Sequence, residues 1–185
     1  MLPGSPIAFL AIWAAMMVGM MLPSLILVLR RYRHRTTLLA GYFLVWAVYG
    51  AAAYVIWTAL GRASQRSPAL GRALPIALGI ALALSGVIQF TGWKARHLAC
   101  CRECAPAASR GAWSDGVRLG VHCCLCCLAL MALLFALGMM RLWAMVAVGA
   151  LIAAERLVAR PLPVVRMIGV VVIAVGTFRA WRALS

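Results

Sequence analysis

The sequence has very little negative charge. Only three acidic residues occur among 185, namely Glu103, Asp115 and Glu155, and charged residues of both signs make up 11% of the chain. Hydrophobic residues make up 66%, whereas soluble domains contain about half. This composition excludes an ordinary soluble domain. It indicates an integral membrane protein with little room for a separate soluble part.

Other sequence features are also missing. No nucleotide-binding motif is present, so we expect no direct coupling to ATP. No basic segment precedes the first apolar run and no small-x-small site follows it, so we expect no cleavable signal peptide. The formal charge of +15 does not indicate a nucleic-acid partner, because the cations lie between apolar runs, where membrane topology uses them.

Uncharged apolar runs predict the membrane-spanning helices. Four runs are long enough to cross a hydrocarbon core of about 30 Å, and two further runs are weaker. The strong runs are Ile7–Leu29, Thr36–Gly61, Ala73–Trp93 and Leu119–Met140, and the weak ones are Leu142–Ala154 and Pro161–Phe178. Arg156 and Arg166 can snorkel if they lie near one membrane surface. The prediction is an all-α bundle of about six transmembrane helices in a single domain, 1–185. The alternative is four full spans plus a re-entrant or tilted pair.

The placement of the cations predicts the orientation. With the N-terminus outside, twelve Lys and Arg residues lie on the cytoplasmic side and six on the other, which agrees with the positive-inside rule. The polar segment Lys94–Asp115 is then a cysteine-rich cytoplasmic loop. Thiols on that side of the membrane stay reduced.

Seven cysteines lie in two groups around this predicted loop. Three are in the loop, four are at the start of the fourth span, and one histidine accompanies each group. These residues are Cys100, Cys101, Cys104 and His97, followed by Cys123, Cys124, Cys126, Cys127 and His122. Because both groups face one membrane surface, we expect them to meet.

The fourth span has small residues on the face that carries its thiols. Gly116, Gly120, Cys123 and Cys127 follow one another at steps of four, three and four, and therefore form one helical stripe that Met131 continues. Cys126 is expected about 60° away from this stripe. Small residues allow another backbone to approach closely. We expect the preceding loop to supply that neighbour and to bring its cysteines.

Three interpretations of these thiols remain open. Soft thiolates from loop and helix would select Cu(I), Zn(II) or an iron–sulfur cluster. The C-x-x-C spacings of Cys101/Cys104, Cys123/Cys126 and Cys124/Cys127 are instead typical of a membrane thiol–disulfide oxidoreductase. A structural subunit of a larger complex, in which cysteine acts only as a small buried residue, is the third interpretation.

A few residues outside the two groups are also candidates. Met16, Met20 and Met21 of the first span form a secondary thioether site or, alternatively, simple helix packing. Gln89 is expected to hydrogen-bond between helices. Glu155 is expected to pair with a Lys or Arg at the membrane boundary or to have a functional role.

Most of these residues fall into four short motifs, one each in the first span, the third span and loop, the fourth span and the later part of the chain. The motif residues are Trp13, Met16, Met20, Met21, Pro23 and Ser24; Gln89, Lys94, Cys100 and Cys104; Gly116, Gly120, Cys123, Cys126, Cys127, Leu130 and Met131; and Gly138, Met140, Trp143, Glu155 and Arg156.

These motifs resemble those of a bacterial family of predicted metal-binding integral membrane proteins, some of which are labelled copper chaperones. The resemblance covers residues 13 to about 156. It implies a ligand core of Cys100, Cys104, Cys123, Cys126 and Cys127. The chain departs from the motifs by having leucine at 125 and 128, where the family has glycine and tryptophan, and by two extra thiols at 101 and 124.

The sequence thus predicts a soft-metal site formed by the loop and the start of the fourth span. Cu(I) is the first choice because methionines accompany the cysteines, and Zn(II) is the second. The expected function is metal binding, delivery or handling without catalysis. The expected partners are membrane lipid and a protein donor or acceptor of metal. The expected location is the bacterial inner membrane, with a periplasmic N-terminus.

Overall fold

The computed structural model describes residues 5–30, 32–103, 111–137, 141–158 and 161–184, and these residues form seven helices. The helices are α1 (Pro6–Leu29), α2 (Arg35–Arg66), α3 (Pro68–Ile88), α4 (Gly92–Glu103), α5 (Ala112–Leu137), α6 (Leu142–Leu157) and α7 (Pro161–Leu184). The predicted all-α class is confirmed.

Five of these helices are long and apolar enough to cross a membrane, namely α1, α2, α3, α5 and α7. Helix α6 has only 16 residues. At about 1.5 Å per residue it falls short of a hydrocarbon core of about 30 Å. The expected count of about six spans is therefore not confirmed, while several potential membrane helices are.

Proline and serine determine where several helices begin. Pro6, Pro68 and Pro161 are each the first residue of a helix, where the missing amide hydrogen has no helical partner to lose. The Ser5 hydroxyl accepts a hydrogen bond from the Ala8 amide at 3.3 Å. Ser67 is extended (φ −130°, ψ 111°), as expected for a residue before proline, and it alone separates α2 from α3.

The segment after α3 differs from the predicted loop. The third span ends at Ile88 rather than Trp93, and Gly92–Glu103 form helix α4. A short polar turn separates the two helices, in which the Thr91 hydroxyl donates to the Ile88 carbonyl at 2.7 Å. Cys100 and Cys101 therefore lie on a helix, which restricts the directions of their side chains more than a loop would.

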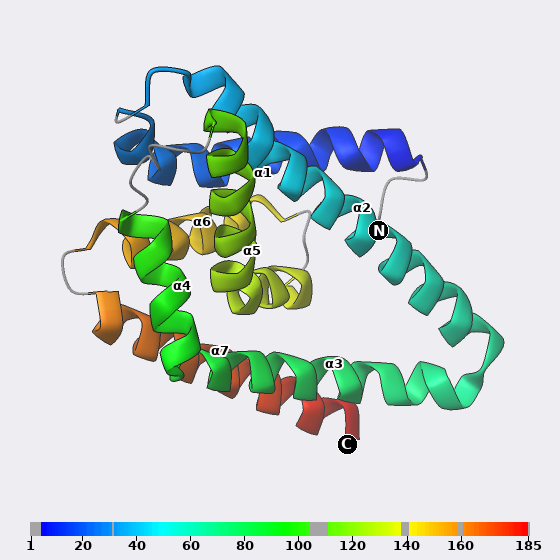
Figure 1. The fold of residues 1–185 in the computed structure, drawn as a ribbon. Helices are drawn as coiled ribbons and strands as arrows, with labels where there is room; N and C mark the ends of the chain where they lie inside the picture. Colours follow the sequence, from blue (N-terminus) through cyan, green and yellow to red (C-terminus); the bar gives the residue numbers. More distant parts are fainter. Residues whose placement is uncertain (1–4, 31, 104–110, 138–140, 159–160, 185) are drawn as a thin grey trace.

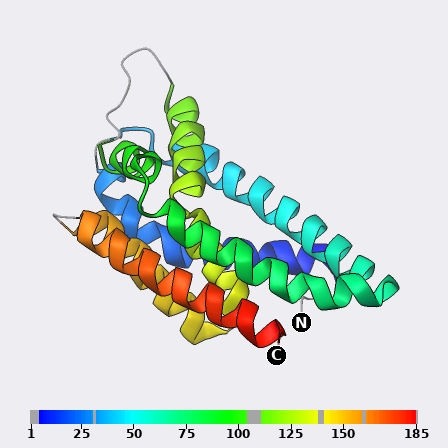
Figure 2. The ribbon, with the colours of Figure 1, turned by 90° about the horizontal axis from the view of Figure 1, so that it is seen from below.

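Helix α5 occupies the middle of the molecule, where it packs against α2, α3, α4 and α6 (Figure 1). The most extensive helix pairings are α3 with α7 and α2 with α5, and Figure 2 shows α3 and α7 side by side from a second direction. Within the most apolar 18-residue window of each helix, 61% of α5 is buried but only 11% of α2. The core of the protein therefore forms around the helix that carries four of the cysteines.

Large apolar side chains also cover the outer faces of the helices. The exposed ones include Val48 and Val55 of α2, Leu84 of α3, Val146 of α6 and Met167 of α7. Water-soluble proteins rarely expose large apolar patches, and those that occur mark protein or membrane contacts. These faces suit a lipid environment.

One of the few acidic side chains anchors the start of α5. Asp115 is only 5% exposed, and its Oδ2 accepts a hydrogen bond from the Tyr32 hydroxyl at 3.2 Å. Tyr32 lies in the connection between α1 and α2, so this contact joins that connection to the beginning of the central helix.

Glycines allow α2 and α5 to approach closely. A Cβ atom added at Gly116 would overlap the Leu38 carbonyl oxygen, and one added at Gly41 would lie 2.6 Å from the Trp113 carbonyl oxygen. In contrast, nothing lies within 4 Å of the corresponding position at Gly19 of α1. The stripe that begins at Gly116 is therefore a contact surface between helix backbones.

We expect Gly116→Ala to lower the free energy of unfolding by about 1–3 kcal/mol, because the added methyl group forces α2 away from α5. Thermal unfolding in detergent, followed by circular dichroism, measures this change. Gly19→Ala is the matched control and should leave the melting temperature unchanged or raise it, because alanine favours a helix over glycine. Equal melting temperatures for the two variants would contradict the close α2–α5 contact.

Candidate metal centre

The thiols of α5 face the interior of the protein. Cys123, Cys126 and Cys127 are each 2% exposed or less, and Cys124 lies at the edge of the core with 9% exposed. For Cys123 and Cys127 this inward direction follows from the glycine stripe, because Gly116 and Gly120 turn the same side of α5 toward α2.

The neighbour on the glycine stripe is α2, and the expectation that the polar segment would pack there is wrong. A Cβ atom at Gly120 would lie 3.1 Å from the Tyr42 carbonyl oxygen. The Tyr42 hydroxyl lies 3.0 Å from Cys123 Sγ. The helix that approaches most closely therefore supplies a phenol rather than a thiol, and glycine spacing alone could not identify it.

Helix α4 instead approaches α5 on the side of Cys126. The sulfur atoms of Cys101 and Cys126 are 3.9 Å apart, and those of Cys126 and Cys127 are 3.7 Å apart. From α1, the Met21 thioether lies 3.9 Å from Cys123 Sγ. We call these five residues the sulfur cluster. It joins side chains from α1, α4 and α5.

Cys101 is the only member of the sulfur cluster that comes from α4, and it is 3% exposed. Its hydrogen bond with Cys126 and its burial together raise the pKa of the Cys101 thiol above the usual range. When no metal is bound, Cys101 therefore keeps its proton at neutral pH. A metal that binds there must displace the proton.

Buried charged side chains cover one side of the sulfur cluster. Arg156 of α6 is 6% exposed, and its Nη2 atom donates to Cys123 Sγ at 2.6 Å and lies 4.0 Å from Cys126 Sγ. Arg156 therefore does not snorkel to a surface, although the sequence allowed it. Its guanidinium points inward because the thiols offer a partner inside the core.

A buried ion pair lies beside this arginine. Lys94 Nζ is 2.8 Å from Glu155 Oε2 and also donates to the backbone carbonyl of Cys126. Gln89 Nε2 donates to Glu155 Oε1 at 3.4 Å. The two cations and one carboxylate leave one net positive charge next to the thiols. Such a charge favours anionic sulfur over neutral sulfur.

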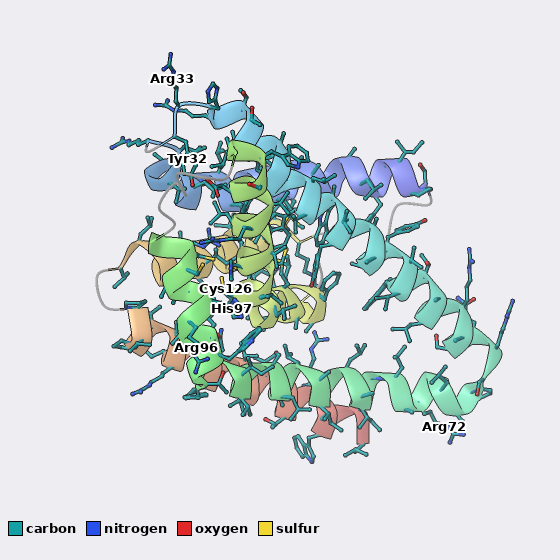
Figure 3. The ribbon with its side chains drawn as sticks, in the orientation of Figure 1. Tyr32, Arg33, Arg72, Arg96, His97 and Cys126 are labelled. Atoms are coloured by element: carbon teal, nitrogen blue, oxygen red, sulfur yellow. The ribbon has the colours of Figure 1, made fainter. Side chains whose placement is uncertain are left out.

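The two histidines lie together, and neither takes part in the sulfur–sulfur contacts. His97 Nδ1 and His122 Nδ1 are 2.8 Å apart, and both side chains are half-buried. The ring of Trp93 flanks His97 with a centroid distance of 4.4 Å. In Figure 3 the labelled His97 and Cys126 lie near each other where α4 meets α5, while Arg33 and Arg72 extend away from the body.

The remaining candidate residues lie around the sulfur cluster. Cys100 is half-buried on α4. Met16 and Met20 are buried in α1, and Met20 packs against Gly149 of α6. Cys104 lies outside the described residues. Within the part of the chain that the structure describes, no sulfur–sulfur contact involves Cys124.

No three or more His, Cys, Asp or Glu side chains in the described ranges are arranged as a ready-made metal site. The donors are instead close in pairs. Sequence reasoning did not identify Tyr42 or Arg156 as part of the site. For Arg156 the available signal was its place beside an acid at the end of a short apolar run, a pattern that does not reveal which way the side chain points.

Comparison with known proteins identified one match. A family model described as PpoB2 copper chaperone matches residues 10–179 of this chain. No curated protein and no solved structure matches it. The matched range includes every residue of the sulfur cluster and both buried cations.

We expect Lys94→Met to lower the free energy of unfolding by about 3–5 kcal/mol, because it leaves the buried Glu155 carboxylate without its partner. Unfolding in detergent measures this change. Lys94→Met combined with Glu155→Leu should recover most of the loss, because the buried carboxylate is then removed together with its partner. Arg96→Met is the surface control on the same helix, and a loss there as large as that of Lys94→Met would contradict the assigned ion pair.

Proposed function

The chain belongs to the PpoB2 copper chaperone family, as its motifs indicated, and from this premise we propose that it binds Cu(I) at the sulfur cluster and passes it to a protein partner. The observation that carries the proposal is the convergence of four thiols and one thioether from three helices beneath a buried guanidinium. Binding and transfer of the ion require no catalysis.

The distances between the sulfur atoms support a shared metal. Two sulfur ligands at about 2.3 Å from one ion lie about 3.8 Å apart in tetrahedral geometry and about 4.0 Å apart in trigonal geometry. The Cys126–Cys127 and Cys101–Cys126 distances are 3.7 and 3.9 Å. An ion can therefore bind between these thiols with little movement of the helices.

The thioether favours copper over zinc. Structural zinc sites use thiolate, imidazole and carboxylate ligands, whereas Cu(I) also selects thioethers. Met21 is fully buried against Cys123, so its sulfur is already directed at a thiol. Zinc remains the second candidate, and the experiment below distinguishes the two metals.

The buried arginine supports an anionic complex. Two thiolates and one Cu(I) carry a net charge of −1, and an isolated charge in an apolar interior is strongly unfavourable. Arg156 donates to one thiol and lies within reach of a second, so its charge balances that of the complex. The polar groups around the thiols thus match the charge that a bound Cu(I) ion creates.

The proposed setting is the bacterial inner membrane, with the N-terminus in the periplasm. Five helices of sufficient length and apolarity support a membrane location. The excess of Lys and Arg on one side supports the orientation. A protein donor or acceptor reaches the cluster from the cytoplasmic side, since α4 and the first half of α5 lie at that boundary in this arrangement.

We expect about one copper ion per chain in protein purified without oxygen, because the cluster provides donors for a single Cu(I). Cys123→Ser combined with Cys126→Ser should lose most of this copper, and Cys124→Ser is the matched control that should retain it. Elemental mass spectrometry and a free-thiol count measure the result, with size-exclusion elution as the test of folding. Stoichiometric zinc would contradict the choice of metal, and oxidised thiols without metal would favour disulfide exchange instead.

We expect Arg156→Gln to weaken Cu(I) binding by about tenfold or more, because a charge-assisted hydrogen bond contributes about 1.5–3 kcal/mol. Arg156→Lys keeps the positive charge and should bind within a few fold of the unaltered protein. Competition with a chromophoric Cu(I) chelator measures both affinities. Equal affinities for the glutamine and lysine variants would show that the charge of Arg156 does not contribute.

A further inference from the structure

The histidine pair is a donor set that the sulfur cluster does not use. His97 of α4 and His122 of α5 are held with their Nδ1 atoms 2.8 Å apart. Both rings are half-buried, whereas the thiols of Cys101 and Cys126 are almost completely buried. The imidazoles are therefore the more accessible of the two groups.

The histidine pair and the thiol pair lie on the same two helices. His97 and Cys101 are four residues apart on α4, and His122 and Cys126 are four residues apart on α5. Residues at this spacing lie one above the other on a helix, with Cβ atoms about 5–6 Å apart. Two neighbouring pairs thus bridge α4 and α5, one with nitrogen donors and one with sulfur donors.

We propose that His97 and His122 form a separate, transient copper site that receives the ion and passes it to Cys101 and Cys126. This inference rests on the proposed function, because it assigns a route to the same sulfur cluster. It concerns the rate at which copper arrives rather than the affinity with which the cluster holds it.

The geometry of the pair fits this role. Two nitrogen ligands at about 2.0 Å from one ion lie about 3.3 Å apart in tetrahedral geometry, so the rings need to separate by about 0.5 Å. The hydrogen bond between the rings requires that one Nδ1 donates and the other accepts. The donating ring moves its proton from Nδ1 to Nε2 through solvent when the ion binds, and both imidazoles remain neutral.

The order of the two sites follows from the softness of the ligands. Imidazole binds copper, but soft thiolates select Cu(I) more strongly. An ion on the histidines therefore gains stability by moving one helical turn to the thiols. Cys101 and Cys126 lose their protons to solvent as their sulfur atoms replace the nitrogen ligands, and no change of copper oxidation state is needed.

The test is the rate of copper loading into the full-length protein in detergent without oxygen. The probe is Cu(I) bound to bicinchoninate, whose visible absorbance falls as copper leaves it. His97→Asn combined with His122→Asn should slow loading by at least about tenfold, because copper is no longer concentrated beside the thiols. The final amount of bound copper should stay the same. His34→Asn, at an exposed histidine before α2, is the matched control and should load at the unaltered rate.

Unchanged loading in the double variant would overturn the proposal and leave the sulfur site intact. Loss of bound copper at equilibrium, in a variant that elutes as a folded protein, would also overturn it, because the histidines would then belong to the holding site. If the unaltered protein takes no copper from the probe, the proposed function itself fails. The two failures are therefore distinguishable.

Discussion

The ion pair between Lys94 and Glu155 holds together the helices on which the thiol arrangement depends. Its lysine also donates to the backbone of Cys126, so a single ammonium group joins α4, α5 and α6. Each charge in this buried region would be costly without its partner. The contacts of Lys94 with Glu155 and with the Cys126 carbonyl therefore form or break together. Their loss would also change the position of Cys101 relative to Cys126.

The long helices and the sulfur-bearing residues that meet in the core could be predicted from sequence, because they depend on local patterns, whereas α4, Tyr42 and the direction of Arg156 could not. Uncharged runs located the long helices, and the stripe of small residues correctly placed Cys123 and Cys127 on one inward face. What packs against that face depends on contacts between distant segments. Gly41 of α2 is as small as the glycines of α5, and no local signal showed that these positions meet.

The direction of the Arg156 side chain is a second feature that local sequence patterns could not predict. An arginine at the end of a short apolar run can extend to the surface or turn inward, and both choices satisfy local rules. The structure resolves the choice because Cys123 supplies a sulfur atom within hydrogen-bonding distance. Sequence reasoning found the thiols and the cation separately but could not pair them.

The structure distinguishes the two thiols that are extra relative to the motifs that the sequence resembles. These thiols are Cys101 and Cys124, and only Cys101 joins the sulfur cluster. The hydrogen bond it makes with Cys126 crosses from α4 to α5. Cys101 therefore adds a potential ligand to the sulfur cluster, whereas Cys124 changes the edge of the core.

Two of the three acidic side chains have partners inside the protein. Asp115 accepts a hydrogen bond from Tyr32, and Glu155 forms an ion pair with Lys94. The chain has 18 Lys and Arg residues against three acidic residues, and the formal net charge is +15. A free metal cation is repelled by such a surface, while an acidic protein is attracted to it. Because two of its few carboxylates are used inside, the protein keeps a strongly cationic exterior, and such an exterior favours contact with anionic groups over cations.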